Sequence, residues 1–262
     1  MSFLYFKKIF NSIFNTKLKP KVISFMGNHD YHNLKFTNNQ NQKIFFKIIN
    51  CYPNSHYIIN GYDFIFWSQD NKLITEEGVT NYSWIIDNLN ASHKNSKIKG
   101  KPIFVFTHIP PKRTVYGSET VLGHEGIYNI LKDYHEVICI SAHSHHSLKN
   151  IKSIWKGNFT VINTQSISYI NSGNFSMNTN QGLVKLQSAK NCYSMGLLAH
   201  LTDKNIIFER VEFLTGHIMK EKWIINFPIN ISNIDYIYEK INKKEIPIFH
   251  NNIIKIKKKE NK

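Results

Sequence analysis

The sequence is poor in the features that mark secreted and membrane proteins. It has three cysteines, Cys51, Cys139 and Cys192, and no two of them are close together in the sequence. An odd number of scattered cysteines does not indicate a disulfide framework and fits a reducing compartment best. The apolar stretch from Phe3 to Phe14 is interrupted by Lys7 and Lys8, and no small-residue cleavage site follows it. It is therefore neither a signal peptide nor a membrane span, and we expect a cytoplasmic protein with no transmembrane segment.

Acidic residues are also scarce, because 18 Asp and Glu stand against 33 Lys and Arg, a net charge of +15. A basic balance of this size is found in proteins that bind nucleic acid or a membrane surface. The lysines are scattered, however, and accompany heavy use of Asn, Ile, Tyr and Phe, which is typical of coding bias in an AT-rich genome. We favour that explanation. A basic nucleic-acid-binding protein stays a third functional hypothesis, and it predicts strongly salt-dependent retention on DNA or RNA.

The chain has ample material for a core, since 42% of its 262 residues are hydrophobic and 13% are aromatic. Hydrophobic spacing predicts helices at Phe3 to Phe14, Thr37 to about Ile49, Tyr82 to Leu89 and Gly126 to Tyr134. Strands are expected at Val22 to Met26, Tyr57 to Ile59, Tyr62 to Trp67, Ile103 to Thr107 and Val137 to Ile140. The dipeptide Asn60-Gly61 predicts a two-residue hairpin. Helices that alternate with buried strands indicate an α/β fold.

After His146 the pattern becomes mainly β, so we expect a second, mostly antiparallel sheet. Its expected strands are Phe159 to Asn163, Gly182 to Leu186, Ser194 to His200 and Ile206 to Phe213. A turn at Thr202 to Asn205 joins the last two. Beyond Ile229 the pattern weakens to a helix from Ile234 to Ile241 and a strand from Ile246 to Lys257. We therefore divide the chain into a domain at 1–228 and an extension at 229–262, either the start of a small β module or a frayed tail.

Three apolar strands each end in groups able to bind a metal. Gly27-Asn28-His29-Asp30 follows the first, His108 follows the second, and Ala142-His143-Ser144-His145-His146 follows the third. Since open α/β sheets place their chemistry at the carboxyl ends of strands, we expect these side chains to lie together. Imidazole suits zinc, iron, manganese or nickel. One such histidine alone would be an ordinary loop residue, but the ordered set of three favours a site.

With these motifs the sequence resembles the calcineurin-like metallophosphoesterase superfamily, in its bacterial phosphohydrolase branch. The resemblance extends over Ser2 to about Pro228 and includes Thr114 to Glu119, Ser153 to Trp155 and Phe159 to Thr164. It implies an α/β fold with a two-sheet β-sandwich core flanked by helices. It also implies metal-dependent hydrolysis of phosphate mono- or diesters by a metal-activated hydroxide. The expected substrate is a small phosphate ester or a nucleotide.

Carried over residue by residue, the resemblance implies that Asn28, His108 and His143 bind one divalent metal ion and that His145 binds another. The ions would be Mn, Fe, Zn or Ni. It implies that His29 stands beside the scissile phosphate as proton donor or charge stabiliser. Ala142 stands where the family usually has Gly, so its methyl group would disturb the turn that aims His143 and His145 if that turn requires a positive φ at this position.

The loop after His108 and the end of the histidine motif supply the candidate substrate-binding residues. Arg113 and Tyr116 follow His108 and could contact a phosphate or a leaving group. A merely solubilising loop is an equal alternative for these two. His146 is either a neighbour of the substrate or part of a polar loop, and we favour the site.

The family's acidic ligands are missing from the sequence. The family places an Asp-x-His and a Gly-Asp motif before the Gly-Asn-His strand, and no Gly-Asp dipeptide occurs anywhere in this chain. We therefore expect an N-terminally truncated fold that binds one metal ion or none, with a separate N-terminal fragment as a possible partner. A phosphoester hydrolase impaired in this chain is the first functional hypothesis. A catalytically inactive remnant or binding module of the same fold is the alternative.

Overall fold

The computed structural model describes residues 3–13, 21–31, 35–68, 82–167, 170, 194–229, 237–241 and 244–248. Its helices are α1 (Phe3–Ile13), the 3₁₀ helix η1 (Asn28–Tyr31), α2 (Asn38–Ile49), α3 (Tyr82–Lys99), α4 (Glu125–Leu131) and the 3₁₀ helix η3 (Ile151–Ser153). Its first six strands are β1 (Ser55–Ile59), β2 (Tyr62–Trp67), β3 (Ile103–Thr107), β4 (Val137–Ser141), β5 (Ile154–Lys156) and β6 (Thr160–Asn163). The others are β7 (Met195–Leu201), β8 (Asn205–Glu212), β9 (Trp223–Asn226), β10 (Ile237–Ile241) and β11 (Lys244–Ile248).

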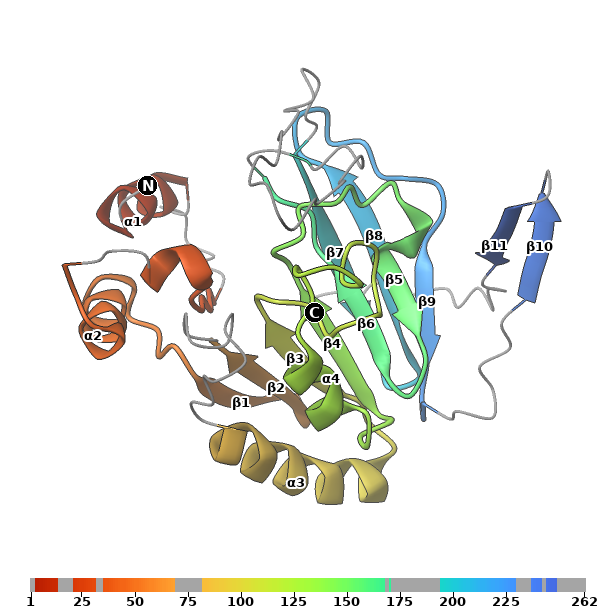
Figure 1. Ribbon diagram of the computed structural model, residues 1–262, viewed down its shortest axis with the longest axis horizontal. Coiled ribbons are helices and arrows are strands. Elements are labelled where there is room, and N and C mark those ends of the chain that lie inside the picture. The colour runs from red at the N-terminus through yellow and green to blue at the C-terminus, as the bar shows by residue number, and fades with distance from the viewer. Residues whose placement is uncertain are drawn as a thin grey trace, which may run out of the picture.

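The first sheet has six strands in the order β1-β2-β3-β4-β6-β5. Strands β2, β3, β4 and β6 run parallel, while β1 and β5 pair antiparallel at the two edges. A second sheet of three antiparallel strands has the order β7-β8-β9, and β10 and β11 form a separate hairpin (Figure 1). The predicted α/β class with a second antiparallel sheet is therefore confirmed.

The parallel strands are apolar on both faces because both faces are covered. In β3, Ile103 and Val105 pack with Leu89 of α3 and Ile127 of α4. Phe104, between them, faces the opposite way and belongs to a core shared with the second sheet. That core takes its other members from both sheets, among them Ile138, Ile162, Ile206, Phe208 and Trp223. Helices, first sheet and second sheet thus form three layers, with α3 and α4 on one side (Figure 1).

Local sequence rules explain several element boundaries. Thr37 caps α2, because its side chain accepts a hydrogen bond from the Gln40 N–H while Gln40 Oε1 accepts one from the Thr37 N–H at 2.8 Å. Asn60 and Gly61 have φ values of 52° and 76°, as a two-residue hairpin between β1 and β2 requires. Helix α3 continues to Lys99, ten residues beyond the predicted end at Leu89, and Gly100 at φ 63° follows it.

Two predicted elements are wrong. Val22 to Met26 forms no strand: the structure gives this segment no backbone ladder, and the Met26 N–H donates to the Ser68 hydroxyl at 2.8 Å instead. An apolar run becomes a strand only when a neighbouring strand accepts its backbone hydrogen bonds. The helix predicted from Ile234 is also wrong, because Ile237–Ile241 is strand β10. The strand predicted from Gly182 to Leu186 lies outside the described residues.

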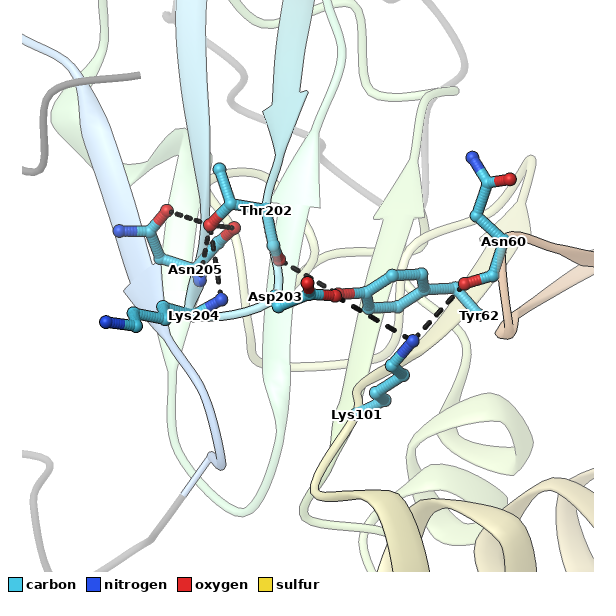
Figure 2. Close-up of polar contacts among 7 residues, drawn as sticks. All are labelled: Asn60, Tyr62, Lys101, Thr202, Asp203, Lys204 and Asn205. Carbon is cyan, nitrogen blue, oxygen red and sulfur yellow. Dashed lines mark hydrogen bonds and ion pairs between the residues drawn. The ribbon is translucent and has the colours of Figure 1, made fainter. Parts of the chain in front are cut away.

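The two sheets are tied together at the end where the parallel strands begin. The Tyr62 hydroxyl donates to the Thr202 carbonyl at 2.9 Å, and the Lys101 ammonium lies 4.2 Å from the centre of the Tyr62 ring (Figure 2). Lys101 also donates to the Asn60 carbonyl at 3.2 Å. Since Tyr62 opens β2, this seam lies at the amino ends of the parallel strands. Their carboxyl ends are at the opposite edge.

Candidate metal centre

Strands β3 and β4 carry two of the predicted ligands to the same edge of the sheet. They are parallel neighbours, with Phe106 opposite Ile140, so His108 after β3 and His143 after β4 emerge side by side. Asn28 arrives from a different direction. It begins η1 directly after the extended segment 21–27, which is anchored to the end of β2 through Ser68. Asn28, His108 and His143 thus lie near one another, although only two of the three motifs follow strands.

Three donor atoms meet at this edge. Nε2 of His108 lies 2.8 Å from Oδ1 of Asn28 and 3.2 Å from Nδ1 of His143. The two imidazole rings are 5.0 Å apart between centres and nearly perpendicular, at 67°. If His108 Nε2 carries a proton, that single proton has to be shared between two acceptors, Asn28 Oδ1 and His143 Nδ1. A dication, in contrast, accepts a lone pair from each of the three atoms, so the set fits three ligands of one metal ion.

The rings are held in the neutral form that ligates metals. Burial in the first place, and then the nearby rings of His143, His145 and His29, lower the pKa of His108 to about 3. Burial also lowers the pKa of His143 to about 4, with smaller contributions from His145 and His29. At neutral pH both rings therefore keep a lone pair available without having to lose a proton first.

The loop after β4 bends through two left-handed residues. His143 and His145 have φ values of 64° and 56°, and Ser144 lies between them. Ala142 is not among the residues of positive φ, so its methyl group meets no strain of the kind considered from the sequence. Its backbone N–H donates to the His108 carbonyl at 3.0 Å, which joins the two histidine-bearing loops.

His145 and His29 lie near this set. Nδ1 of His145 is buried, and burial is the first cause that lowers the pKa of this ring, followed by the proximity of His29 and His146. His29 is exposed and lies near enough to His108, His143 and His145 to influence the pKa of each. An exposed imidazole at the rim is accessible to a phosphate ester from solvent.

Asp30 shapes the turn that presents Asn28. Its Oδ2 accepts a hydrogen bond from the Gly27 N–H at 2.8 Å, and its own N–H donates to the Gly27 carbonyl at 3.1 Å. Burial raises the pKa of the Asp30 carboxyl, while the hydrogen bond from Gly27 and the neighbouring His29 act in the opposite direction. This carboxylate is therefore committed to the backbone of η1.

The three candidate substrate-binding residues have other contacts. The Arg113 guanidinium forms a two-pronged ion pair with Glu125, with NH2 at 2.6 and 2.8 Å from the carboxylate oxygens. His146 is 4% exposed, and its ring lies 4.4 Å from that of Tyr116. Tyr116 thus covers His146. The structure leaves the role of all three as a prediction.

The second half of a two-metal site is not evident. Within the described ranges, no three His, Cys, Asp or Glu side chains are grouped so that they could hold a metal ion. Asn28, His108 and His143 do not form such a group, because only two of them are histidines and Asn28 contributes an amide oxygen. A dication normally binds with acidic ligands in such sites, and the residues described here offer it one amide oxygen and imidazole nitrogens.

Two polar residues that the sequence did not single out as site residues contact the loop from Ala142 to Leu148. They are Asn163 at the end of β6 and Arg210 in β8. Asn163 had a usable signal, because it follows the buried run Val161-Ile162 at the same carboxyl edge as His108 and His143. Arg210 had none, since nothing local distinguishes an arginine in an antiparallel strand.

A family model described as calcineurin-like phosphoesterase matches residues 4–147, which include all five candidate metal and catalytic residues. Among curated proteins, none is similar enough to count as a match. One solved structure, described as "GAP50 the anchor in the inner membrane complex of Plasmodium", shares 16% identity and a TM-score of 0.37 over 69% of this chain. This chain covers 56% of that structure, just over half of its length. A likeness of that size carries no argument here.

Proposed function

The chain belongs to the calcineurin-like phosphoesterase family, and from that premise we propose that it hydrolyses phosphate mono- or diesters with a divalent metal ion held by Asn28, His108 and His143. The observation that carries the proposal is the convergence of Asn28 Oδ1 and His143 Nδ1 on His108 Nε2, at 2.8 and 3.2 Å. A bound Mn, Fe, Zn or Ni ion would polarise the phosphate and lower the pKa of a water molecule. We assign His145 to a second, weaker metal position.

The chain's own residues have definite tasks in this proposal. His108 and His143 stay neutral and hold their lone pairs toward the metal position. Asp30 keeps the turn of η1 closed through Gly27, so that Asn28 keeps its direction. His29, exposed at the rim, donates a proton to the leaving oxygen or stabilises the charge on the phosphate. Arg113, Tyr116 and His146 are the proposed neighbours of the substrate, a small phosphate ester or a nucleotide.

The alternative function is that of a binding module without catalytic activity. The observation in its favour is that no three His, Cys, Asp or Glu side chains are grouped as a metal site among the described residues. In that case the chain keeps the fold, binds one metal ion or a phosphate ester, and does not turn it over. A separate N-terminal fragment that supplies acidic ligands has no support in the structure or in the comparisons, and it stays a prediction.

Metal content and turnover together decide between the two. We expect the purified protein to bind Co²⁺ or Mn²⁺, and to hydrolyse bis(p-nitrophenyl) phosphate faster than its His29→Ala variant. His135→Ala is the matched control, because His135 is an exposed histidine whose ring contacts the Asn158 carbonyl, away from the site. Metal binding without turnover above His29→Ala, at any divalent metal, would reject catalysis and leave the binding module. Metal binding unaffected by Asn28→Ala and His108→Ala would reject the site itself.

A further inference from the structure

We propose that Asn163 and Arg210 are positioning residues that hold the histidine loop, defined here as Ala142 to Leu148, in its metal-binding geometry. The inference rests on the proposed metal centre, because it assigns a purpose to residues that do not reach the metal position themselves.

The loop needs to be held because its ligand-bearing residues are in an unfavourable conformation. His143 and His145 both have left-handed φ values, 64° and 56°, which a side chain with a β-carbon adopts at a cost in energy. Such a conformation persists only when surrounding contacts fix it. The structure supplies those contacts at both ends of the loop.

Asn163 fixes the start of the loop from the neighbouring strand. In the amide orientation that satisfies both of its ends, its nitrogen donates to the Ala142 carbonyl at 2.7 Å and to the Ser141 carbonyl at 3.3 Å. Its oxygen accepts from the Ser144 hydroxyl at 2.5 Å. Asn163 and Ser144 are both fully buried. The Asn163 amide therefore binds both Ala142, which precedes His143, and Ser144, which lies between His143 and His145.

Arg210 fixes the end of the loop from the second sheet. Its NH1 donates to the Leu148 carbonyl at 3.0 Å, and its NH2 donates to the Glu221 carbonyl at 3.0 Å. The guanidinium is 1% exposed and lies over the Trp223 ring at 4.7 Å. The backbone N–H of Leu148 donates to Gln165 Oε1 at 3.1 Å. Both backbone groups of Leu148 are thus held by side chains from elsewhere in the fold.

The choice of polar groups at these two positions supports a positioning role. Both side chains are buried, at 0% and 1% exposure, where an apolar side chain would fill the space without loss of solvation. Arg210 donates to the Leu148 carbonyl, and Asn163 adds a second donor to the Ala142 carbonyl, which also accepts a hydrogen bond from the Ser144 N–H. The orientation of His143 and His145 therefore depends on how β6 and β8 pack. Removal of a group that orients a metal ligand typically lowers metal affinity by about 10–100-fold.

The test compares two fully buried asparagines at opposite ends of the sheets. Asn205 is the control: it is also 0% exposed, and its Oδ1 accepts from the Thr202 hydroxyl at 2.9 Å, beside Asp203 and Lys204 (Figure 2). We expect Asn163→Ala and Asn205→Ala to lower stability in urea to a similar extent. Only Asn163→Ala should weaken Co²⁺ binding, by about 10–100-fold in a titration followed by visible absorption, with a change in the shape of the Co²⁺ spectrum.

Two milder variants keep the test decisive if Asn163→Ala does not fold. Ser144→Ala removes the hydroxyl that Asn163 holds, and Arg210→Met keeps the bulk of the side chain while removing its donors. Both should weaken Co²⁺ binding several-fold. Wild-type affinity and spectrum in all the folded variants would overturn the proposal, and so would an equal loss of affinity in Asn205→Ala.

A second measurement separates this proposal from the proposed function. In the metal-free protein, hydrogen exchange of the Ser144 and His145 amides should become faster in Asn163→Ala, while the turn at Thr202 to Asn205 keeps its protection. If the wild-type protein binds no Co²⁺, the proposed function fails and this exchange result alone decides the positioning role. Unchanged exchange of the loop amides would then overturn it.

Discussion

Gly27 and His108 lie so close that no side chain fits between them. A β-carbon built on Gly27 would stand 2.8 Å from Nδ1 and 2.9 Å from Cε1 of the His108 ring. Gly27 is not among the glycines of positive φ, so the contact itself and not the backbone conformation requires glycine here. The absence of a side chain at position 27 thus sets the place of a ligand 81 positions further along the chain.

Gly27→Ala is therefore expected to displace the His108 ring and to weaken metal binding. A contact under 3.0 Å forces a shift, and a ligand moved by a few tenths of an ångström loses affinity, about 10-fold or more by analogy with the loss of orienting groups. The measurement is a Co²⁺ titration of both proteins at equal ionic strength. Equal dissociation constants for wild type and Gly27→Ala would contradict the packing argument.

The metal-free protein should lose stability as the pH falls from about 6.5 to about 4. Burial lowers the pKa of His108 to about 3 and of His143 to about 4, whereas both rings titrate near 6.5 in the unfolded chain. In that window the unfolded state binds protons that the folded state does not, so the free energy of unfolding decreases by up to about 1.4 kcal/mol per pH unit for each ring. Above pH 6.5 the contribution of these rings fades, and about one pH unit higher it is nearly gone.

Urea unfolding from pH 4 to pH 8 measures this slope. His108→Gln removes one of the two groups, so its curve should be flatter below pH 6.5 than that of the wild type. His135→Gln, a change at an exposed histidine, serves as the control and should keep the wild-type slope. A wild-type curve that is flat from pH 4 to 6.5 would show that the rings are not buried as described.

Gly117→Ala is expected to destabilise the protein more than Gly216→Ala. Both glycines have positive φ, 87° and 70°, so both replacements carry the same kind of backbone strain, about 1 kcal/mol. At Gly117 the new β-carbon would also stand 2.4 Å from Nε2 of His146, whereas Gly216 has nothing within 4 Å. The additional loss, about 1–3 kcal/mol, reports the packing of His146 under Tyr116. Equal losses in urea unfolding would mean that the His146 ring moves aside at no cost.

Tyr62→Phe should lower stability by about 1 kcal/mol and leave metal binding unchanged. The replacement removes the 2.9 Å hydrogen bond to the Thr202 carbonyl at the seam between the sheets while keeping the aromatic ring (Figure 2). The seam lies at the amino ends of the parallel strands, away from His108. Thermal unfolding and a Co²⁺ titration of the same samples give the two values. A change in Co²⁺ affinity would show that the two ends of the sheet are coupled.

Much of the fold could be predicted because the signals are local. The alternation of apolar runs located β3 and β4, Thr37 located the start of α2, and Asn60-Gly61 located the first hairpin. The prediction failed at Val22 to Met26, where an apolar run looks like a strand whether or not a partner strand exists. It also failed at Ile237–Ile241, where the weak pattern fitted either a helix or a strand.

The proximity of two candidate ligands could be predicted from the sequence. Parallel neighbours end at one edge of a sheet, so His108 after β3 and His143 after β4 had to emerge together once both strands were recognised. Asn163 carried the same signal and was not singled out. The contacts of Arg113 with Glu125 and of Tyr116 with His146 could not be predicted, because each joins side chains whose distance depends on how a loop folds.

The amino-acid sequence by itself determined which groups can ligate a metal, that His108 and His143 stand at strand ends, and that few carboxylates accompany them, because residue type and hydrophobic period are properties of the chain alone. Only the tertiary structure decided that Asn28 and His143 both contact the His108 ring. It also decided that His143 and His145 have left-handed conformations, and that Asn163 and Arg210 form hydrogen bonds with their loop. Those facts depend on distances between residues as far apart in the chain as Asn28 and His108, which are separated by 80 positions. Packing of the layers sets such distances, and no local pattern records them.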